Sequence, residues 1–169
     1  SIDLINKKEK WITFVGKLNK AKGYDVFASS IKKVLNQNPN WKAKIIGDEK
    51  REKIALNHNR AHILGFKKHN EVLSIFKKTS IAVACSRWEE PFGRTSLEAS
   101  ANGCAVIITN KGGLPETVTD AKILKKLNVK ELARTINLLI KNDKLRKKLQ
   151  NLSIKNFYLT HSYVACLLY

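Results

Sequence analysis

The chain has 169 residues, 43% of them hydrophobic and 27% charged, which fits one ordinary globular domain and excludes a disordered chain. Lys and Arg number 32 against 14 acidic residues, and the net charge of +18 favours anionic partners such as phosphates, nucleic acid or an acidic membrane surface. The apolar runs are too short to span a bilayer, and three scattered cysteines make neither a disulfide framework nor a CxxC metal pattern. We therefore expect a single domain over residues 1–169, in the reducing cytoplasm.

Alternating strand and helix patterns run along most of the chain. Short β-branched runs bounded by Gly, Asp, Asn or Ser predict buried strands over 11–18, 41–48, 62–66, 81–86 and 104–110, with a weaker one over 121–126. Apolar residues at helical spacing predict helices over 24–37 and 69–79, and the tail from Val129 onward predicts two or three Lys-rich amphipathic helices. With each strand followed by a helix, the pattern predicts an α/β fold, a Rossmann-like parallel sheet with helices on both faces.

The loops that follow the strands are the expected place for chemistry, because open parallel sheets bind ligands at the carboxyl ends of their strands. The loop GKLNKAKG, residues 16–23, follows the first strand. Gly16 and Gly23 allow close backbone approach there, and Lys17 and Lys22 carry positive charge. Since the loop is neither a GxGxxG fingerprint nor a Walker A loop, a solvated surface turn is the alternative interpretation.

A second loop, SRWEEPFG at residues 86–93, places adjacent acids before the helical stretch RTSLEASANG. In one interpretation Thr95 and Glu98 form a capping box, and the acids merely complement the helix dipole. In the other, the helix N-terminus directs its free N–H groups at a phosphate, while Glu90 and Glu98 accept hydrogen bonds from hydroxyls of a sugar or ribose. The residues alone leave both interpretations open.

Read onward as EEPFGRTSLEASANGCAVIITNKGGLPE, the same stretch resembles the donor-binding half of a retaining glycosyltransferase of the GT-B fold, family 4 (group 1). FVGKLNKAKG, IIGD and HILGF are similar to upstream segments of that family, so the resemblance covers about residues 11–118. It implies the C-terminal half of a GT-B fold, with the N-terminal acceptor domain lacking. It also implies transfer of a sugar from a nucleoside diphosphate with retention at the anomeric carbon.

The resemblance further implies roles for the motif residues. Lys17 and Lys22 would neutralise the diphosphate of the nucleotide sugar. Glu90 would hold sugar hydroxyls and Glu98 the ribose, and Lys22 and Glu90 are the two residues expected to contribute to catalysis. The other expected donor-binding residues are Gly16, Phe92, Gly93, Arg94, Thr95 and Gly113. Position 17 is most often Arg in the family. This chain therefore has the single ammonium group of a lysine where the family has a guanidinium that can donate two parallel hydrogen bonds.

Further expectations concern metals and partners. No Asp-x-Asp pair occurs in the chain, and the resemblance implies donor binding without metal or other cofactor. The basic surface suits contact with the anionic inner face of a membrane, as in bacterial polysaccharide or lipopolysaccharide synthesis. A GT-B phosphorylase or epimerase is the alternative within the fold. Nucleic-acid binding is a weaker alternative, because no recognition module is present and the acidic loop would repel phosphodiesters. The choice among UDP, GDP and ADP, the sugar and the acceptor are left open.

Overall fold

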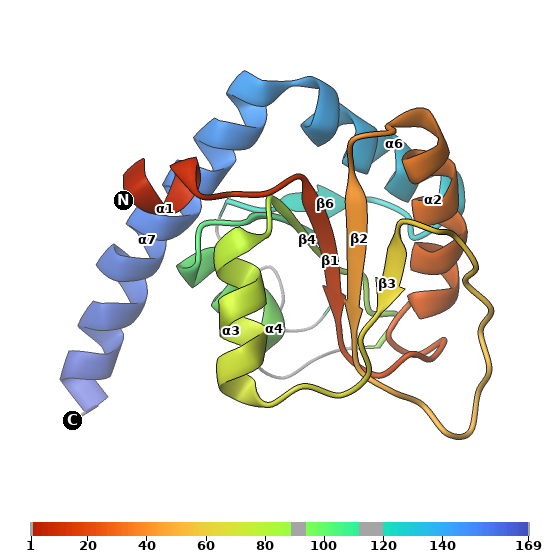
Figure 1. Ribbon diagram of the computed structural model, residues 1–169. Coiled ribbons are helices and arrows are strands. Elements are labelled where there is room, and N and C mark those ends of the chain that lie inside the picture. The colour runs from red at the N-terminus through yellow and green to blue at the C-terminus, as the bar shows by residue number, and fades with distance from the viewer. Residues whose placement is uncertain (1, 89–93, 112–119, 169) are drawn as a thin grey trace.

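The computed structural model describes residues 2–88, 94–111 and 120–168. These residues form one parallel sheet with helices packed against it (Figure 1). The strands are β1 (Trp11–Val15), β2 (Lys42–Ile46), β3 (Ala61–Ile63), β4 (Ile81–Ala84), β5 (Ala105–Thr109) and β6 (Lys122–Leu124). The helices are α1 (Ile2–Asn6), α2 (Tyr24–Gln37), α3 (His69–Lys78), α4 (Arg94–Ala101), α6 (Val129–Lys141) and α7 (Asp143–Leu168). The predicted α/β Rossmann-like class is confirmed.

The sheet has the order β3-β2-β1-β4-β5-β6, and every neighbouring pair is parallel. In this doubly wound order the direction of winding reverses between β1 and β4. The loops after β1 and β4 are therefore the two that diverge from the switch point. These are the loops that contain the Lys-rich and acidic motifs of the sequence.

Helices cover both faces of the sheet, with α2 and α6 on one side and α3 and α4 on the other (Figure 1). The strands supply apolar side chains to both layers, as β5 shows: Ala105 and Ile107 pack with the α2 and α6 side, and Val106 and Ile108 with the α3 and α4 side. Strands that are apolar on both faces are typical of a sheet buried between helices. The long α7 leaves α6 and packs against α4 and α1.

The expectation that a helix follows each strand is wrong between β2 and β3. Residues 47–60 form no helix there, and from residue 51 to 60 exposed and partly buried positions alternate. A period of two belongs to extended chain, in which Ile54 and Leu56 pack against the core while Lys53, Ala55 and Asn57 are exposed. The N-terminal helix α1 was not predicted. The described part of the chain contains no helix long and apolar enough to cross a membrane.

Basic side chains bind the carbonyl groups at the C-terminal ends of three helices. Lys8 Nζ donates to the carbonyl oxygen of Phe76 in α3 at 2.9 Å, and to that of Asn102 directly after α4. Arg60 Nη1 donates to the carbonyl oxygen of Asn38, the C-cap of α2, at 2.9 Å. Burial lowers the pKa of Lys8. Because a helix C-terminus has a partial negative charge and unpaired carbonyls, these cations stabilise the helix ends that lie opposite the strand-end loops.

Arg146 has the same role at the end of α6. Its Nη1 donates to the carbonyl oxygens of Leu139 at 2.7 Å and Ile140 at 3.1 Å, and its Nη2 to Asp143 Oδ1 at 2.6 Å. The guanidinium lies 5.3 Å from the ring centroid of Trp41, and only 8% of Arg146 is exposed. This buried cation therefore joins α6, α7 and the loop before β2.

We expect Arg146→Ala to lower the free energy of unfolding by about 2 to 3 kcal/mol, because it leaves buried carbonyls without their donor. Arg146→Lys should lower the free energy of unfolding by less, because lysine keeps the positive charge but lacks the several N–H donors of the guanidinium. Arg134→Ala is the matched control on α6: that side chain is 71% exposed and pairs with Glu131. It should change stability by at most about 0.5 kcal/mol. Urea unfolding of the three variants measures this, and equal losses for Arg146→Ala and Arg134→Ala would contradict the role.

Candidate functional site

A narrow crevice of about 50 Å³ opens at the switch point between β1 and β4. Eight residues line it: Phe14, Val15, Gly16, Lys22, Ala84, Cys85, Ser86 and Thr95. They come from the ends of β1 and β4, the loop after each, and the first turn of α4. A cationic side chain from one loop thus shares a crevice with the first turn of a helix.

The two loops meet in a backbone contact that leaves no room for a side chain at Gly23. This residue is the N-cap of α2 and has a φ of +74°, in the left-handed region. A Cβ placed there would lie 2.0 Å from the carbonyl oxygen of Cys85. The sequence therefore needs glycine at this position for two reasons, the conformation and the close approach of the second loop.

A second close contact fixes the loop after β1 against the loop after β2. Gly16 N–H donates to the carbonyl oxygen of Ile46 at 3.0 Å. Gly47 has a φ of +136°, and a Cβ there would lie 1.8 Å from the carbonyl oxygen of Gly16. The three loops after β2, β1 and β4 are thus locked to one another by main-chain packing.

Hydrogen bonds from Arg87 strengthen this arrangement. Its backbone N–H donates to the carbonyl oxygen of Ala21 at 2.9 Å, and its Nη1 to that of Lys20 at 2.6 Å. The guanidinium also binds both carboxylate oxygens of Asp25, at 2.6 and 2.9 Å. This bidentate pair holds the pKa of Asp25 below its usual range. The loop after β4 is therefore anchored to the loop after β1 and to the first turn of α2.

Cys85 lines the crevice but is a structural residue. Burial raises the pKa of its thiol to about 12, and its Sγ donates to the carbonyl oxygen of Gly23 at 3.5 Å. A thiol that stays protonated at neutral pH is a poor nucleophile. Cys85 therefore packs as a small buried group.

Glu98 lies in α4 and faces the start of α3. His69 Nδ1 is 3.5 Å from Glu98 Oε1, with 20% of the Glu98 side chain exposed. Because α4 begins at Arg94, Thr95 sits within its first turn and is not the N-cap residue of a capping box. The partner of Glu98 is therefore on a neighbouring helix, at the edge of the sheet where the strands end.

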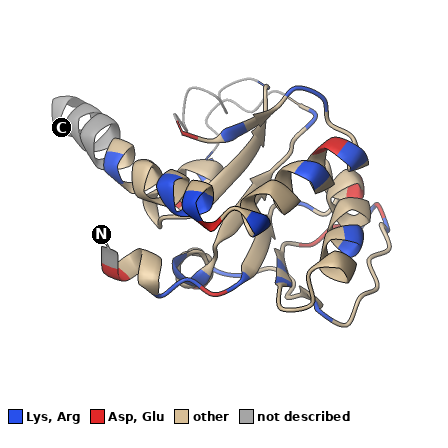
Figure 2. Cartoon of the chain, turned by 90° about the horizontal axis from the view of Figure 1, so that it is seen from above, with Lys and Arg blue, Asp and Glu red and all other residues tan. Residues whose placement is uncertain are grey.

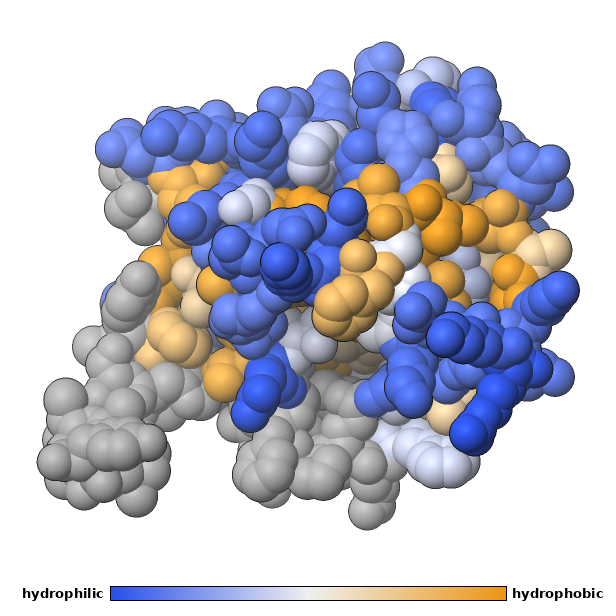
Figure 3. Space-filling view, turned by 60° about the horizontal axis from the view of Figure 1, so that its bottom comes forward, coloured by the Kyte–Doolittle hydropathy of each residue, from blue (hydrophilic) through white to orange (hydrophobic). Residues whose placement is uncertain are grey.

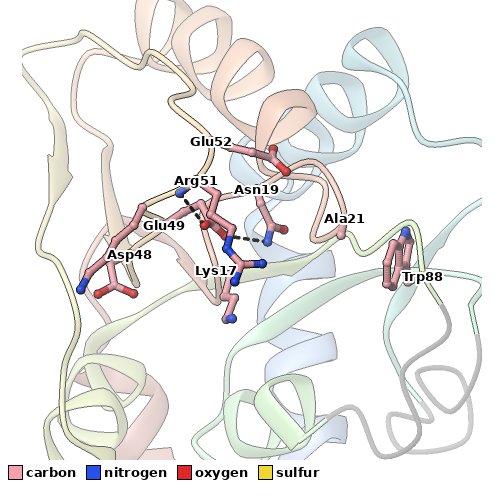
Figure 4. A pocket seen from close by; sticks show the side chains of 9 residues that line it. Lys17, Asn19, Ala21, Asp48, Glu49, Arg51, Glu52 and Trp88 are labelled. Carbon is pink, nitrogen blue, oxygen red and sulfur yellow. Dashed lines mark hydrogen bonds between the residues drawn. The ribbon is translucent and has the colours of Figure 1, made fainter.

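A larger cavity of about 490 Å³ lies on the other side of the loop after β1 (Figure 4). Nine residues line it: Lys17, Asn19, Ala21, Asp48, Glu49, Lys50, Arg51, Glu52 and Trp88. In Figure 4 the charged side chains gather around Lys17, and Trp88 stands apart beyond Ala21. Figure 3, in which this edge of the molecule comes forward, shows apolar surface between groups of hydrophilic side chains.

The structure brings several of the predicted site residues together. Gly16, Lys22 and Thr95 line the crevice, and Lys17 lines the adjacent cavity. Arg94 is exposed at the start of α4, and Glu98 lies one turn further along that helix. The other predicted positions lie outside the described residues: Glu90, Phe92, Gly93 and Gly113. The roles assigned to all of them stay predictions.

Sequence reasoning missed three contributors to this edge. His69 was not predicted as a site residue, although its place at the start of a helix after a strand-end loop was a usable signal. Arg87 and Asp25 gave no signal, because their pairing joins positions 62 residues apart. The acidic run in IIGDEKRE, three acids in a chain with few of them, was visible in the sequence and marks the wall of the larger cavity.

Known proteins share this fold and sequence. A family model described as "Glycosyl transferases group 1" matches residues 2–155. An uncharacterized glycosyltransferase of Methanocaldococcus jannaschii is 37% identical over 145 residues, which cover 80% of this chain and 40% of that protein. The lipopolysaccharide core biosynthesis mannosyltransferase LpsB of Rhizobium meliloti is 30% identical over 125 residues, covering 68% of this chain and 35% of LpsB. The chain thus spans less than half the length of these relatives.

Solved structures agree with the fold. The C-terminal domain of a glycosyl transferase group 1 family protein from Francisella tularensis superposes with a TM-score of 0.77 at 25% identity, covering 90% of this chain and 86% of that one. HepE of Anabaena, in complex with UDP and glucose, superposes with a TM-score of 0.74 at 20% identity, covering 94% of this chain and 48% of HepE. The likeness to HepE is one of fold.

We expect Gly23→Ala to lower the free energy of unfolding much more than Gly65→Ala. Both glycines have nearly the same φ, +74° and +73°, but a Cβ at Gly65 would meet nothing within 4 Å. Gly65→Ala should therefore lose about 1 kcal/mol from backbone strain alone, and Gly23→Ala at least about 2 kcal/mol more, because Cys85 must move. Urea unfolding gives the comparison. Equal losses would show that the close approach to Cys85 contributes nothing.

Proposed function

Because this chain belongs to the group 1 glycosyl transferases, we propose that it is the half of such an enzyme that binds the nucleotide-sugar donor. The reaction proposed is retaining transfer of the sugar to a glycan or lipid-linked acceptor, in the synthesis of cell-surface polysaccharide or lipopolysaccharide. The relationship to LpsB of Rhizobium meliloti supports that setting.

The crevice at the switch point is the observation that carries the proposal. Lys22 supplies positive charge on one wall, and the first turn of α4, with Thr95, forms another. A helix N-terminus presents unpaired N–H groups and a partial positive charge, so it suits the phosphates of a ligand. That HepE of Anabaena, which has the same fold, was solved with UDP supports a nucleoside diphosphate as that ligand.

The proposed roles are those that the family resemblance implies for residues in and around this crevice. Lys22 and Lys17 neutralise the diphosphate from the two sides of the loop that holds them. Glu98 accepts hydrogen bonds from the ribose, and Glu90 from the transferred sugar. Backbone N–H groups at Phe92, Gly93, Arg94 and Thr95 complete the phosphate site, and Gly113 belongs to its wall. Donor binding is proposed to need no metal.

A complete reaction also needs an acceptor site. The two relatives described above are more than twice as long as the part of them that this chain matches. We propose that the acceptor and the groups nearest the reacting bond are held by an N-terminal domain outside these 169 residues. The isolated chain should then bind the donor without transferring its sugar.

A cytoplasmic location, with contact to the inner face of the membrane, is also part of the proposal. Lys and Arg are spread over α6, α7 and the rim of the sheet, with few acids among them (Figure 2). Each basic residue near an anionic surface contributes about 1 kcal/mol of attraction. In sedimentation with vesicles, the chain should bind those containing phosphatidylglycerol and be released by salt. Equal binding to neutral vesicles would refute an electrostatic attachment.

Two substitutions, of Lys22 in the crevice and of Glu98 further along α4, separate the proposed phosphate contact from the proposed ribose contact. Lys22→Ala should weaken UDP binding by about 1.5 to 3 kcal/mol, the range for hydrogen bonds to charged groups, and leave uridine binding almost unchanged. Glu98→Gln should weaken UDP and uridine alike, because the ribose is common to both. Lys20→Ala is the matched control, since Lys20 is exposed in the same loop and lines neither cavity.

Calorimetry of the variants with both ligands measures these effects, after a thermal-shift comparison of UDP, GDP and ADP has chosen the base. If Glu98→Gln lowers the melting temperature but changes no affinity, Glu98 is a structural partner of His69 and the proposed ribose contact is wrong. If Lys22→Ala and Lys20→Ala weaken UDP equally, the effect is general charge and the phosphate contact is refuted.

A further inference from the structure

An excess of lysines lies at the end of the sheet where the strands begin, opposite the donor crevice. Four segments meet there: residues 7–10, 38–42, 77–80 and 141–148. Their acids are Glu9 and Asp143, and their exposed lysines, named the basic end here, are Lys7, Lys10, Lys42, Lys77, Lys78, Lys141, Lys144, Lys147 and Lys148. In the described part of the chain, none of these lysines donates a side-chain hydrogen bond or forms an ion pair. They are separate from Lys8, Arg60 and Arg146, which bind the helix carbonyls.

Contacts between these segments make the basic end one surface. Lys42 N–H donates to the carbonyl oxygen of Lys10 at 3.0 Å, which joins the starts of β1 and β2. A hydrogen bond from Arg146 holds the pKa of Asp143 below its usual range, and this pairing compensates the acid. The charges of Lys147 and Lys10 lower the same pKa, so the start of α7 lies beside the start of β1. Figure 2, seen from this end of the sheet, shows few acids among the basic residues.

At the opposite end of the sheet, acids lie among the basic residues. The loop after β2 carries as many acids as basic residues: Asp48, Glu49 and Glu52 against Lys50, Arg51 and Lys53. Asp25 pairs with Arg87 beside the crevice, and Glu98 follows Arg94 in α4. A broad anionic surface would meet carboxylates at that end, but lysines almost alone at the basic end.

An exposed leucine lies among these lysines. Leu138 on α6 is 44% exposed, and Arg134 and Lys141 lie four residues before it and three after it, on the same exposed side of the helix. An apolar side chain surrounded by cations suits the interface of a membrane, where the leucine enters the acyl boundary and the cations bind headgroup phosphates. Single-stranded nucleic acid needs aromatic rings for its bases to stack on. The exposed aromatic side chains of the described residues, Phe66 and Trp88, belong to loops at the other end.

We propose that the basic end and Leu138 dock on an anionic membrane, so that the donor crevice faces away from the bilayer. This docking rests on the membrane contact of the proposed function and assigns that contact to one end of the sheet. Strands β1 and β5 have five residues each, which span roughly 17 Å, so the crevice stands at least about that far from the headgroups. The nucleotide sugar then enters from water. A lipid-linked acceptor must carry a glycan long enough to reach the crevice, rather than a single sugar on its lipid.

Sedimentation of the 169-residue chain with vesicles of phosphatidylglycerol and phosphatidylcholine tests the surface. Each lysine near an anionic membrane strengthens binding roughly fivefold, so the double variant Lys144→Gln/Lys148→Gln should bind at least about tenfold more weakly. The matched control is Lys125→Gln/Lys126→Gln, which removes the same charge from exposed positions after β6, and it should lose at most about twofold. Equal weakening by the two variants would leave a general charge effect and overturn the docking surface.

The orientation is tested by energy transfer from tryptophan to dansyl groups on the lipid headgroups. Trp11 begins β1 beside the basic end, and Trp88 lies in the loop after β4 at the other end. A chain that keeps only Trp11, with Trp41→Phe and Trp88→Phe, should transfer more efficiently than a chain that keeps only Trp88, with Trp11→Phe and Trp41→Phe. Equal transfer, or more from Trp88, would refute the orientation.

The apolar contact has its own pair of variants. Leu138→Ser should weaken vesicle binding severalfold, because it removes the side chain that enters the lipid. Ile123→Ser, at a side chain 49% exposed on β6, should not change the binding. Equal losses in the two variants would contradict the insertion of Leu138.

Further measurements separate this docking from the donor site. UDP affinity should be the same with and without vesicles, and the same in Lys144→Gln/Lys148→Gln as in the unchanged chain. If UDP does not bind while the vesicles bind through the basic end, the proposed donor site fails and the docking surface stands. If UDP binds while the vesicles do not, the docking surface fails. If duplex DNA displaces the chain from vesicles at equal phosphate concentration, the basic end is a nucleic-acid surface and the proposed docking is wrong.

Discussion

The close approach of backbone at the switch point is the constraint on which the rest of the site depends. With no Cβ at Gly23, the carbonyl group of Cys85 packs directly on the loop that holds Lys22. The missing Cβ of Gly47 lets the loop after β2 pack on Gly16 in the same way. These contacts set the spacing of three loops without the help of flexible side chains. A cation from one loop and a helix N-terminus from another can then face the same small volume.

The two ends of the sheet differ in electrostatic character for a related reason. Helices in a parallel α/β fold run antiparallel to the strands, so their C-termini gather where the strands begin. Lys8, Arg60 and Arg146 neutralise the carbonyl groups there. Part of the basic excess of the chain therefore stabilises the fold rather than binding a partner. At the other end, the side chain of Asn128 caps the N-terminus of α6, whereas the first turn of α4 lies beside the crevice and suits an anionic ligand.

Much of this arrangement was predictable from periodicity, and the rest depended on contacts between distant residues. The strands were predicted because they are short β-branched apolar runs between turn residues, and α2 because its apolar residues repeat with the helical period: Val26, Phe27, Ile31, Val34 and Leu35. The extended link between β2 and β3 was missed. A helix was expected there because parallel strands are usually joined by one, although the residues of this link alternate between apolar and polar as in an extended chain. The Arg87 and Asp25 pair could not be predicted, because nothing local marks two positions that only the fold brings together. The roles of Lys17, Lys22 and Glu98 came from a family resemblance.

Acidic residues in so basic a protein have a physical explanation in this arrangement. A nucleotide sugar and its acceptor present two kinds of group, phosphates that need cations and hydroxyls that need acceptors. A uniformly basic edge would bind the first and offer too few acceptors to the second. In this fold the loop between Gly16 and Gly23 separates them, with Lys22 and the start of α4 on one side and the balanced charges around Glu49 and Glu52 on the other. Because Lys17 lies near Glu49, whose pKa it helps to lower, part of the positive charge of Lys17 is already compensated by that carboxylate. The acids therefore limit the anion attraction of this edge to the crevice itself.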